Sequence, residues 1–116
     1  DKLVGVSVVR DSAMWEHVQR RARQKGVGPE KFSLLFDRDF GGYNRFNDQL
    51  MDFLTTFSEI SGTFAEPIYT GKVFYAVHQL CLEGYFPKEH KVLLIHTGGL
   101  QGWNGYPELT PFKTDR

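Results

Sequence analysis

Three short apolar segments of the chain have the composition of buried β-strands. Residues 3–9 are rich in β-branched side chains, residues 32–36 follow Pro29, and residues 92–95 precede a His-Thr-Gly-Gly sequence. A nearly continuous apolar run is typical of a strand that is covered on both faces of a parallel sheet. We therefore predict three strands at these places, and we expect the first of them to be central in its sheet.

Three helices are predicted between these strands, because apolar residues recur there every three to four positions. The stripes lie within residues 14–25, 46–61 and 71–83, and each is followed by a glycine that can end a helix. The element order βαβααβ favours an open, mostly parallel three-layer α/β/α sheet. We expect this α/β portion to occupy residues 1–99 and a loop-like tail, with docked aromatic side chains, to occupy residues 100–116.

Composition narrows the possible partners. The 116 residues fit one domain, and 14 basic and 14 acidic side chains give no net charge that would attract nucleic acid or an anionic membrane. No apolar run approaches the roughly 20 residues that span a bilayer. The single cysteine, Cys81, cannot form an internal disulfide, which suits a reducing compartment. We expect a cytoplasmic protein without nucleic-acid or membrane partners, and the start at an apolar strand indicates a piece of a longer chain.

Three loops should meet where ligands bind in parallel sheets, beyond the carboxyl ends of the strands. They are residues 39–43, residues 69–72 at the start of a helix, and residues 96–99 after the third predicted strand. Their glycines allow a close backbone approach, and their Thr and Tyr side chains offer hydroxyls. Each loop alone is more typical of an ordinary turn. A non-catalytic module that binds a small anion or a partner protein is therefore an alternative.

Taken together, these motifs resemble one enzyme family. The motifs are EPIYTGK at residues 66–72, EGYFP at 83–87, VLLIHTGGLQG at 92–102 and FGGY at 40–43. In this order and spacing they resemble the carboxy-terminal part of the 1-aminocyclopropane-1-carboxylate deaminase and D-cysteine desulfhydrase family. The resemblance covers most of residues 32–102 and extends more loosely to the first strand and helix.

The resemblance implies roughly the last third of a pyridoxal-phosphate enzyme of fold type II, related to the tryptophan synthase β subunit. It implies that the Schiff-base lysine and the phosphate loop lie upstream, so this piece alone should be inactive. From this end the family supplies the ring side of the cofactor site, where Thr70 and Thr97 approach the pyridine nitrogen beside Gly98. Tyr43 and Tyr69 would flank the ring and the substrate as catalytic residues. The implied partners are a small amino-acid substrate, the remainder of the chain and a homo-oligomer.

One position bears on the substrate. Family members that are deaminases proper carry an acidic residue where this chain has Thr70, whereas desulfhydrase-like members carry threonine. The resemblance thus favours elimination from D-cysteine, which gives pyruvate, sulfide and ammonia. Opening of the cyclopropane amino acid to 2-oxobutyrate and ammonia is the second possibility.

Other polar residues are not expected to carry chemistry. Lys72 follows Thr-Gly but lacks the rest of a Walker phosphate loop, and we expect it on a solvated helix face. The four histidines lack metal-ligand spacing, so no metal site is predicted. We expect His96 to brace the loop that carries Thr97.

Overall fold

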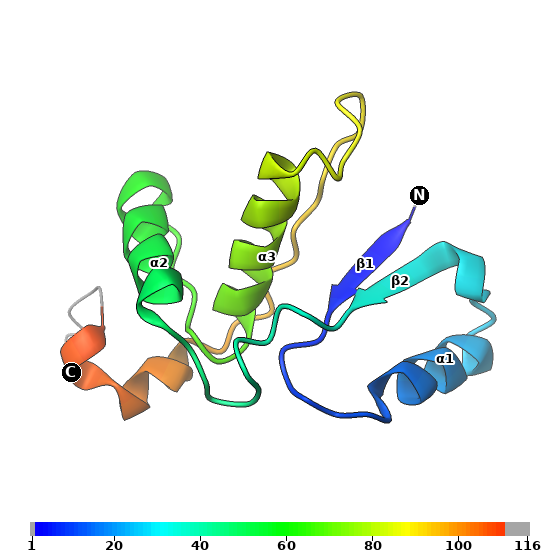
Figure 1. The fold of residues 1–116 in the computed structure, drawn as a ribbon, viewed down its shortest axis with the longest axis horizontal. Helices are drawn as coiled ribbons and strands as arrows, with labels where there is room; N and C mark the ends of the chain where they lie inside the picture. The colour runs from blue at the N-terminus through cyan, green and yellow to red at the C-terminus, as the bar shows by residue number, and fades with distance from the viewer. Residues whose placement is uncertain (1, 111–116) are drawn as a thin grey trace.

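A parallel βαβ unit forms the amino-terminal half of the molecule. The computed structural model describes residues 2–110. Strand β1 (Leu3–Val6) pairs in parallel with β2 (Phe32–Leu35), and α1 (Met14–Gln24) with the short 3-10 helix η1 (Pro29–Lys31) connects them (Figure 1). The ring centroids of Trp15 in α1 and Phe32 in β2 lie 5.6 Å apart. Through this contact the helix packs on the sheet. The first two predicted strands and the first predicted helix are therefore present.

Two further helices form the other half, and local signals set their ends. Helix α2 (Asp48–Ser61) begins after Asn47, whose side chain accepts a hydrogen bond from the Leu50 N–H, and it ends at Gly62, where φ is 69°. Helix α3 (Thr70–Leu82) starts within the EPIYTGK motif. Both helices agree with the predicted ranges to within about two residues, the usual uncertainty of helix ends.

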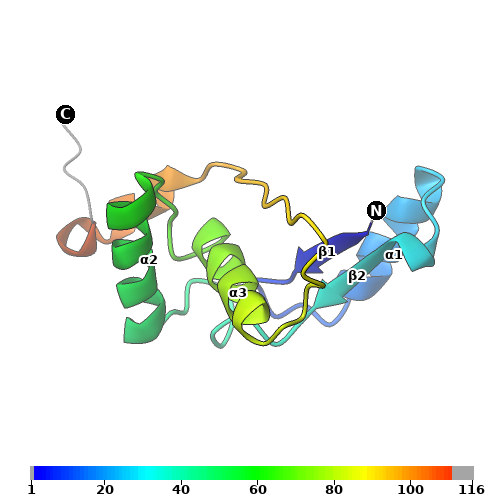
Figure 2. The ribbon, with the colours of Figure 1, turned by 90° about the horizontal axis from the view of Figure 1, so that it is seen from above.

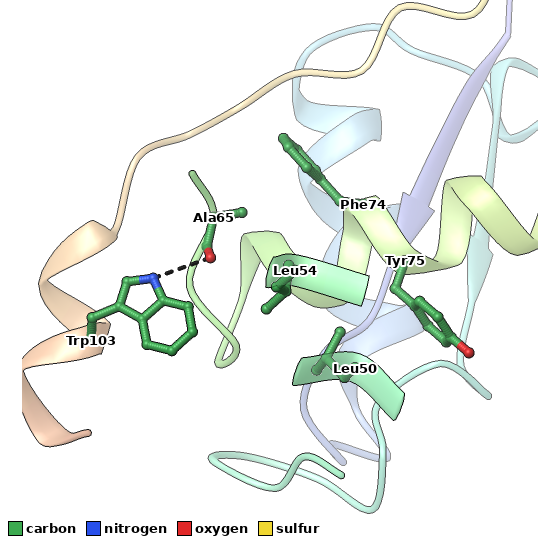
Figure 3. Close-up of a cluster of buried hydrophobic side chains, with 6 residues drawn as sticks. All are labelled: Leu50, Leu54, Ala65, Phe74, Tyr75 and Trp103. Atoms are coloured by element: carbon green, nitrogen blue, oxygen red, sulfur yellow. Dashed lines mark hydrogen bonds between the residues drawn. The ribbon is translucent and has the colours of Figure 1, made fainter. Parts of the chain in front are cut away.

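The hydrophobic core lies between α2, α3 and the segment after them. Figure 3 shows its buried members, which are Leu50, Leu54, Ala65, Phe74, Tyr75 and Trp103. Trp103 belongs to the 3-10 helix η2 (Leu100–Gly105), and the shorter η3 (Pro107–Leu109) follows η2. The indole N–H of Trp103 donates a hydrogen bond of 3.2 Å to the Ala65 carbonyl oxygen. The first part of the predicted tail, η2, is thus docked on the core through Trp103. Residues 111–116 of the predicted tail lie outside the described residues.

The third predicted strand is wrong for this chain. Residues 92–95 form no strand with any of the described residues, and the Leu93 side chain is 87% exposed. A strand forms only where a neighbour accepts and donates its backbone hydrogen bonds, and β1 and β2 pair only with each other in the described part of the chain. The sequence indicates the apolar character of this segment correctly, but it does not identify a strand that would pair with the segment.

The three-layer prediction is not confirmed, and β1 is not a central strand within the described residues. The sheet has two strands in the order β1-β2, and residues of β1 are exposed or only half-buried. The radius of gyration is 15.4 Å, whereas a closed domain of this length would have about 13 Å. In Figure 2 the βαβ unit and the α2–α3 half accordingly extend side by side along the longest axis.

Candidate functional site

Two exposed tyrosines lie together at the start of α3. The ring centroids of Tyr43 and Tyr69 are 5.9 Å apart, and the side chains are 60% and 45% exposed. The Tyr43 side chain is the main cause that raises the pKa of the Tyr69 phenol above its ordinary value of 10.0, and the charge of Glu66 adds to this. The Tyr69 phenol therefore keeps its proton to a higher pH than a free tyrosine does. The raised pKa of Tyr69 disfavours a proton relay by its tyrosinate.

A buried carboxylate organises the first turn of α3. Both oxygens of Glu66 accept hydrogen bonds, from the backbone N–H groups of Ile68, Tyr69 and Thr70 over 2.6–3.1 Å. These N–H groups have no partner within the helix, so a carboxylate at this end satisfies them and interacts favourably with the helix dipole. Glu66 is fully buried. Its position fixes the backbone of the residues that carry the candidate site.

Thr70 uses its hydroxyl proton inside the protein. Its Oγ1 lies 2.9 Å from a Glu66 carboxylate oxygen and 3.4 Å from the Gly98 carbonyl oxygen. Both partners are acceptors, and a hydroxyl has one proton to donate. Towards any third group, Thr70 can therefore offer only an oxygen lone pair. Thr70 and Gly98 are brought together here, but the Thr70 side chain is buried.

The loop that carries Thr97 and Gly98 is braced by His96, as expected. The His96 Nδ1 accepts a hydrogen bond of 2.9 Å from the Gly98 N–H, so its Nε2 carries the proton that it donates to the Phe64 carbonyl over 2.7 Å. Thr97 is exposed on this loop. Gly98 has φ of 90° and open space where a side chain would lie, so the backbone there is accessible to a ligand.

Lys72 is not on a solvated face, which corrects the prediction from its sequence context. Its side chain is fully buried, and its Nζ donates to the carbonyl oxygens of Asp39 and Gly42 over 2.8 Å each and of Val8 over 3.4 Å. Burial lowers the pKa of Lys72 from 10.5, although the charges of Asp39 and Glu66 partly oppose this. The folded chain therefore binds fewer protons than the unfolded chain between the lowered pKa and 10.5, and this group makes stability rise with pH there.

Asp39 connects the two strand-end loops. Its buried carboxylate accepts hydrogen bonds over 3.0 Å from the Arg10 guanidinium and from the Gly41 N–H. Burial alone would raise the pKa of Asp39, but these two hydrogen bonds and the charge of Arg10 outweigh it and lower the pKa below 3.8. An open depression beside this ion pair is lined by Val9, Arg10, Asp11, Ser12, Phe36 and Asp39. It lies at the carboxyl ends of β1 and β2.

Residues 2–110 contain neither a cluster of metal-binding side chains nor a helix suited to span a membrane. Within that range no group of three or more His, Cys, Asp and Glu side chains is arranged to hold a metal ion. Likewise, none of the described helices has the length and apolar content that crossing a membrane requires.

Sequence reasoning missed the two buried charges of the site, Glu66 and Lys72. Position relative to the helix could have indicated Glu66, because an acidic residue just before a helix can accept from its free N–H groups. Nothing in the sequence indicates the partners of Lys72, which are backbone carbonyls 30 to 64 residues away.

The fold and the site together define an α/β protein with a cluster of hydroxyls, phenols and glycines at one helix start. Sequence comparison then narrows the class. No protein-family model matches the chain. A protein of Pyrococcus horikoshii, provisionally named 1-aminocyclopropane-1-carboxylate deaminase, is 31% identical over 104 residues, covering 85% of this chain and 31% of that protein.

Bacterial relatives carry the same name. The 1-aminocyclopropane-1-carboxylate deaminase of Allorhizobium ampelinum is 32% identical over 67% of this chain, and that of Rhizobium rhizogenes is 32% identical over 78%. The chain spans about a quarter to a third of the length of these relatives. The family resemblance of the motifs is thus confirmed: the chain is homologous to part of the 1-aminocyclopropane-1-carboxylate deaminases.

Proposed function

We propose that this chain is part of a pyridoxal-phosphate-dependent enzyme that releases ammonia from a small amino acid, and that it forms the ring side of the cofactor site. The observations that support this most are two contacts at the start of α3: Tyr43 packs on Tyr69, and the Thr70 hydroxyl lies 3.4 Å from the Gly98 carbonyl oxygen. The names of the relatives support the deaminase class.

The residues present fit an aromatic cofactor ring. Tyr43 and Tyr69 offer exposed aromatic faces, Thr97 an exposed hydroxyl, and Gly98 an open backbone, and such groups suit a flat ring that carries a nitrogen. Thr70 is buried next to them, so it would reach the ring only at one edge. Thr97, with Thr70 beside it, is therefore the better candidate to meet the ring nitrogen.

The cofactor, when bound, supplies an electron sink for bond cleavage at the amino acid. Around the cofactor, residues of this chain would hold protons and direct hydrogen bonds. Tyr69 keeps its phenolic proton well above neutral pH, since Tyr43 and Glu66 both raise the pKa of that phenol from 10.0. Thr70 presents a lone pair, since its proton is directed to Glu66. The site edge therefore combines a protonated phenol with a threonine oxygen that can only accept.

Two substrates follow from two observations. The names of the relatives favour the cyclopropane amino acid, whereas the threonine at position 70 favours D-cysteine. Both reactions release ammonia from a small amino acid. We place the deaminase class first and leave the two substrates to direct assay.

The experiment uses the purified full-length protein with pyridoxal phosphate. Release of 2-oxobutyrate from the cyclopropane amino acid is compared with release of pyruvate and sulfide from D-cysteine, and Tyr69→Phe is assayed beside the parent. Turnover of either substrate that depends on the cofactor and falls in Tyr69→Phe supports the proposal. The absence of any pyridoxyl-lysine after borohydride reduction and mass spectrometry would refute it and favour the non-catalytic binding module.

We also propose that apolar surface of this chain is covered by other polypeptide, either the rest of its own chain or a second copy. Leu3, Leu93 and Ile95 are 64%, 87% and 66% exposed, and strands β1 and β2 each have one edge unpaired within the described residues. Such edges and apolar side chains promote association. Light scattering of the 116-residue chain should show self-association that Leu93→Lys reduces. A monodisperse monomer would contradict this.

A further inference from the structure

The loop at residues 39–44 has an unusual backbone. Phe40 and Asn44 have positive φ values of 57° and 56°, and Gly41 and Gly42 between them have 104° and 123°. A left-handed conformation costs a non-glycine residue about 1–2 kcal/mol, so a loop of this kind persists only where other contacts hold it. Tyr43 lies inside this loop, and its placement therefore depends on those contacts.

Lys72 supplies the contacts from inside the protein. Its ammonium has three protons, and three carbonyl oxygens accept them, from Asp39 and Gly42 in this loop and from Val8 after β1. The two loop carbonyls flank Phe40 and Gly41, the first half of the left-handed stretch. Lys72 itself belongs to the first turn of α3, three residues after Tyr69.

We infer that Lys72 is a positioning residue: its buried ammonium ties the strained loop of Tyr43 to the helix start of Tyr69 and so creates the tyrosine pair. The side chain is fully buried, and it acts through the backbone of residues 39–42. This rests on the proposed function only where the pair is said to face a cofactor, because the pair itself is present in the chain alone.

The charges around the tyrosine pair give the inference a directional test. The groups that raise the pKa of Tyr69 are Tyr43 and Glu66. If Lys72 places Tyr43, its removal lets the two rings separate, and the pKa of Tyr69 falls towards 10.0. Loss of a positive charge alone would raise the pKa of a phenol. The sign of the shift therefore separates placement from electrostatics.

The experiment compares Lys72→Met, which keeps the length without donors, with Lys72→Arg, which keeps donors, in protein labelled with ¹³C at tyrosine Cζ. The Tyr69 signal is assigned with Tyr69→Phe, and Lys88→Met at an exposed position is the control. In Lys72→Met, the nuclear Overhauser cross peak between the ring protons of Tyr43 and Tyr69 should disappear, and the pKa of Tyr69 should fall. Lys72→Arg and Lys88→Met should keep the cross peak and the pKa of the parent protein. A folded Lys72→Met with both properties unchanged would overturn the inference, as would their equal loss in Lys72→Arg.

If Lys72→Met does not fold, Lys72→Ala is measured with and without ethylammonium chloride, whose cation fits the vacated space. Return of the tyrosine cross peak with the amine supports the inference, and an amine that changes nothing overturns it. No cofactor is present in these measurements. The role of Lys72 can therefore be confirmed even if the protein binds no cofactor, and it can be refuted even if the protein does.

Discussion

The two halves of the molecule differ in how completely they bury their apolar residues. Between α2 and α3, Leu50, Leu54 and Ala76 are at most 2% exposed. In the βαβ unit, by contrast, α1 has no buried residue and β2 is only half-buried. The helical half closes its core with its own side chains, including that of Trp103, whereas the strands leave one edge each unpaired within the described residues. The candidate site lies where the two halves meet, and Lys72 connects them.

The sharpest test of this comparison pairs two leucines. Leu54→Ala should lower the free energy of unfolding by about 2–5 kcal/mol, because it opens a cavity in a closed core. Leu93→Ala should change it by less than about 0.5 kcal/mol, because this exposed side chain packs on little. Urea denaturation followed by circular dichroism measures both. Similar losses at the two positions would show that the comparison is mistaken.

Glu66→Gln tests the organisation of the site at the border of the two halves. The glutamine amide places an NH₂ group where the carboxylate accepts from backbone N–H groups, so at least one buried donor loses its partner. We expect a loss of about 1–3 kcal/mol in the free energy of unfolding. Glu59→Gln, at an exposed position of α2, should have almost no effect. Equal stability of the two variants in thermal unfolding would argue against a structural role of the carboxylate.

Asp39→Asn should have a smaller effect on stability, and this effect should depend on pH. The lowered pKa of Asp39 means that its contribution to stability is complete above pH 3.8 and is lost as the pH falls through the folded-state pKa. Asp39→Asn should therefore flatten the fall of the unfolding temperature below pH 3.8, and the exposed Asp52→Asn should not. A parent curve that Asp39→Asn leaves unaltered would contradict the assignment.

The helices could be predicted from the sequence because their signals are local. Asn47 and Gly62 determine the two ends of α2 with groups from the helix itself and its neighbours. Residues 92–95 could not be predicted in the same way, because apolar character does not say which strand will pair with them. Gly71 shows a similar limit. It suggested a close approach to a ligand, but a side chain there would clash with the Glu66 carbonyl oxygen, so the glycine serves internal packing.

Within the candidate site, the motifs identified the residues but not their states. The structure packs Tyr43 on Tyr69, places the Thr70 hydroxyl 3.4 Å from the Gly98 carbonyl oxygen and leaves Thr97 exposed. Their role towards a cofactor stays a prediction. The direction of the Thr70 proton depends on Glu66, and the raised pKa of Tyr69 depends on Tyr43, so both follow from three-dimensional contacts.

Cofactor affinity of one pair of variants tests the proposed ring site most directly. Thr97→Val keeps the shape of the side chain and removes the hydroxyl, and Thr56→Val does the same at an exposed position of α2. Pyridoxal phosphate is titrated into the full-length protein and followed by absorption. Loss of one hydrogen bond predicts binding about fivefold weaker, with an altered absorption band, for Thr97→Val alone. Affinity and spectrum that match those of Thr56→Val would contradict the placement of the cofactor ring at this site.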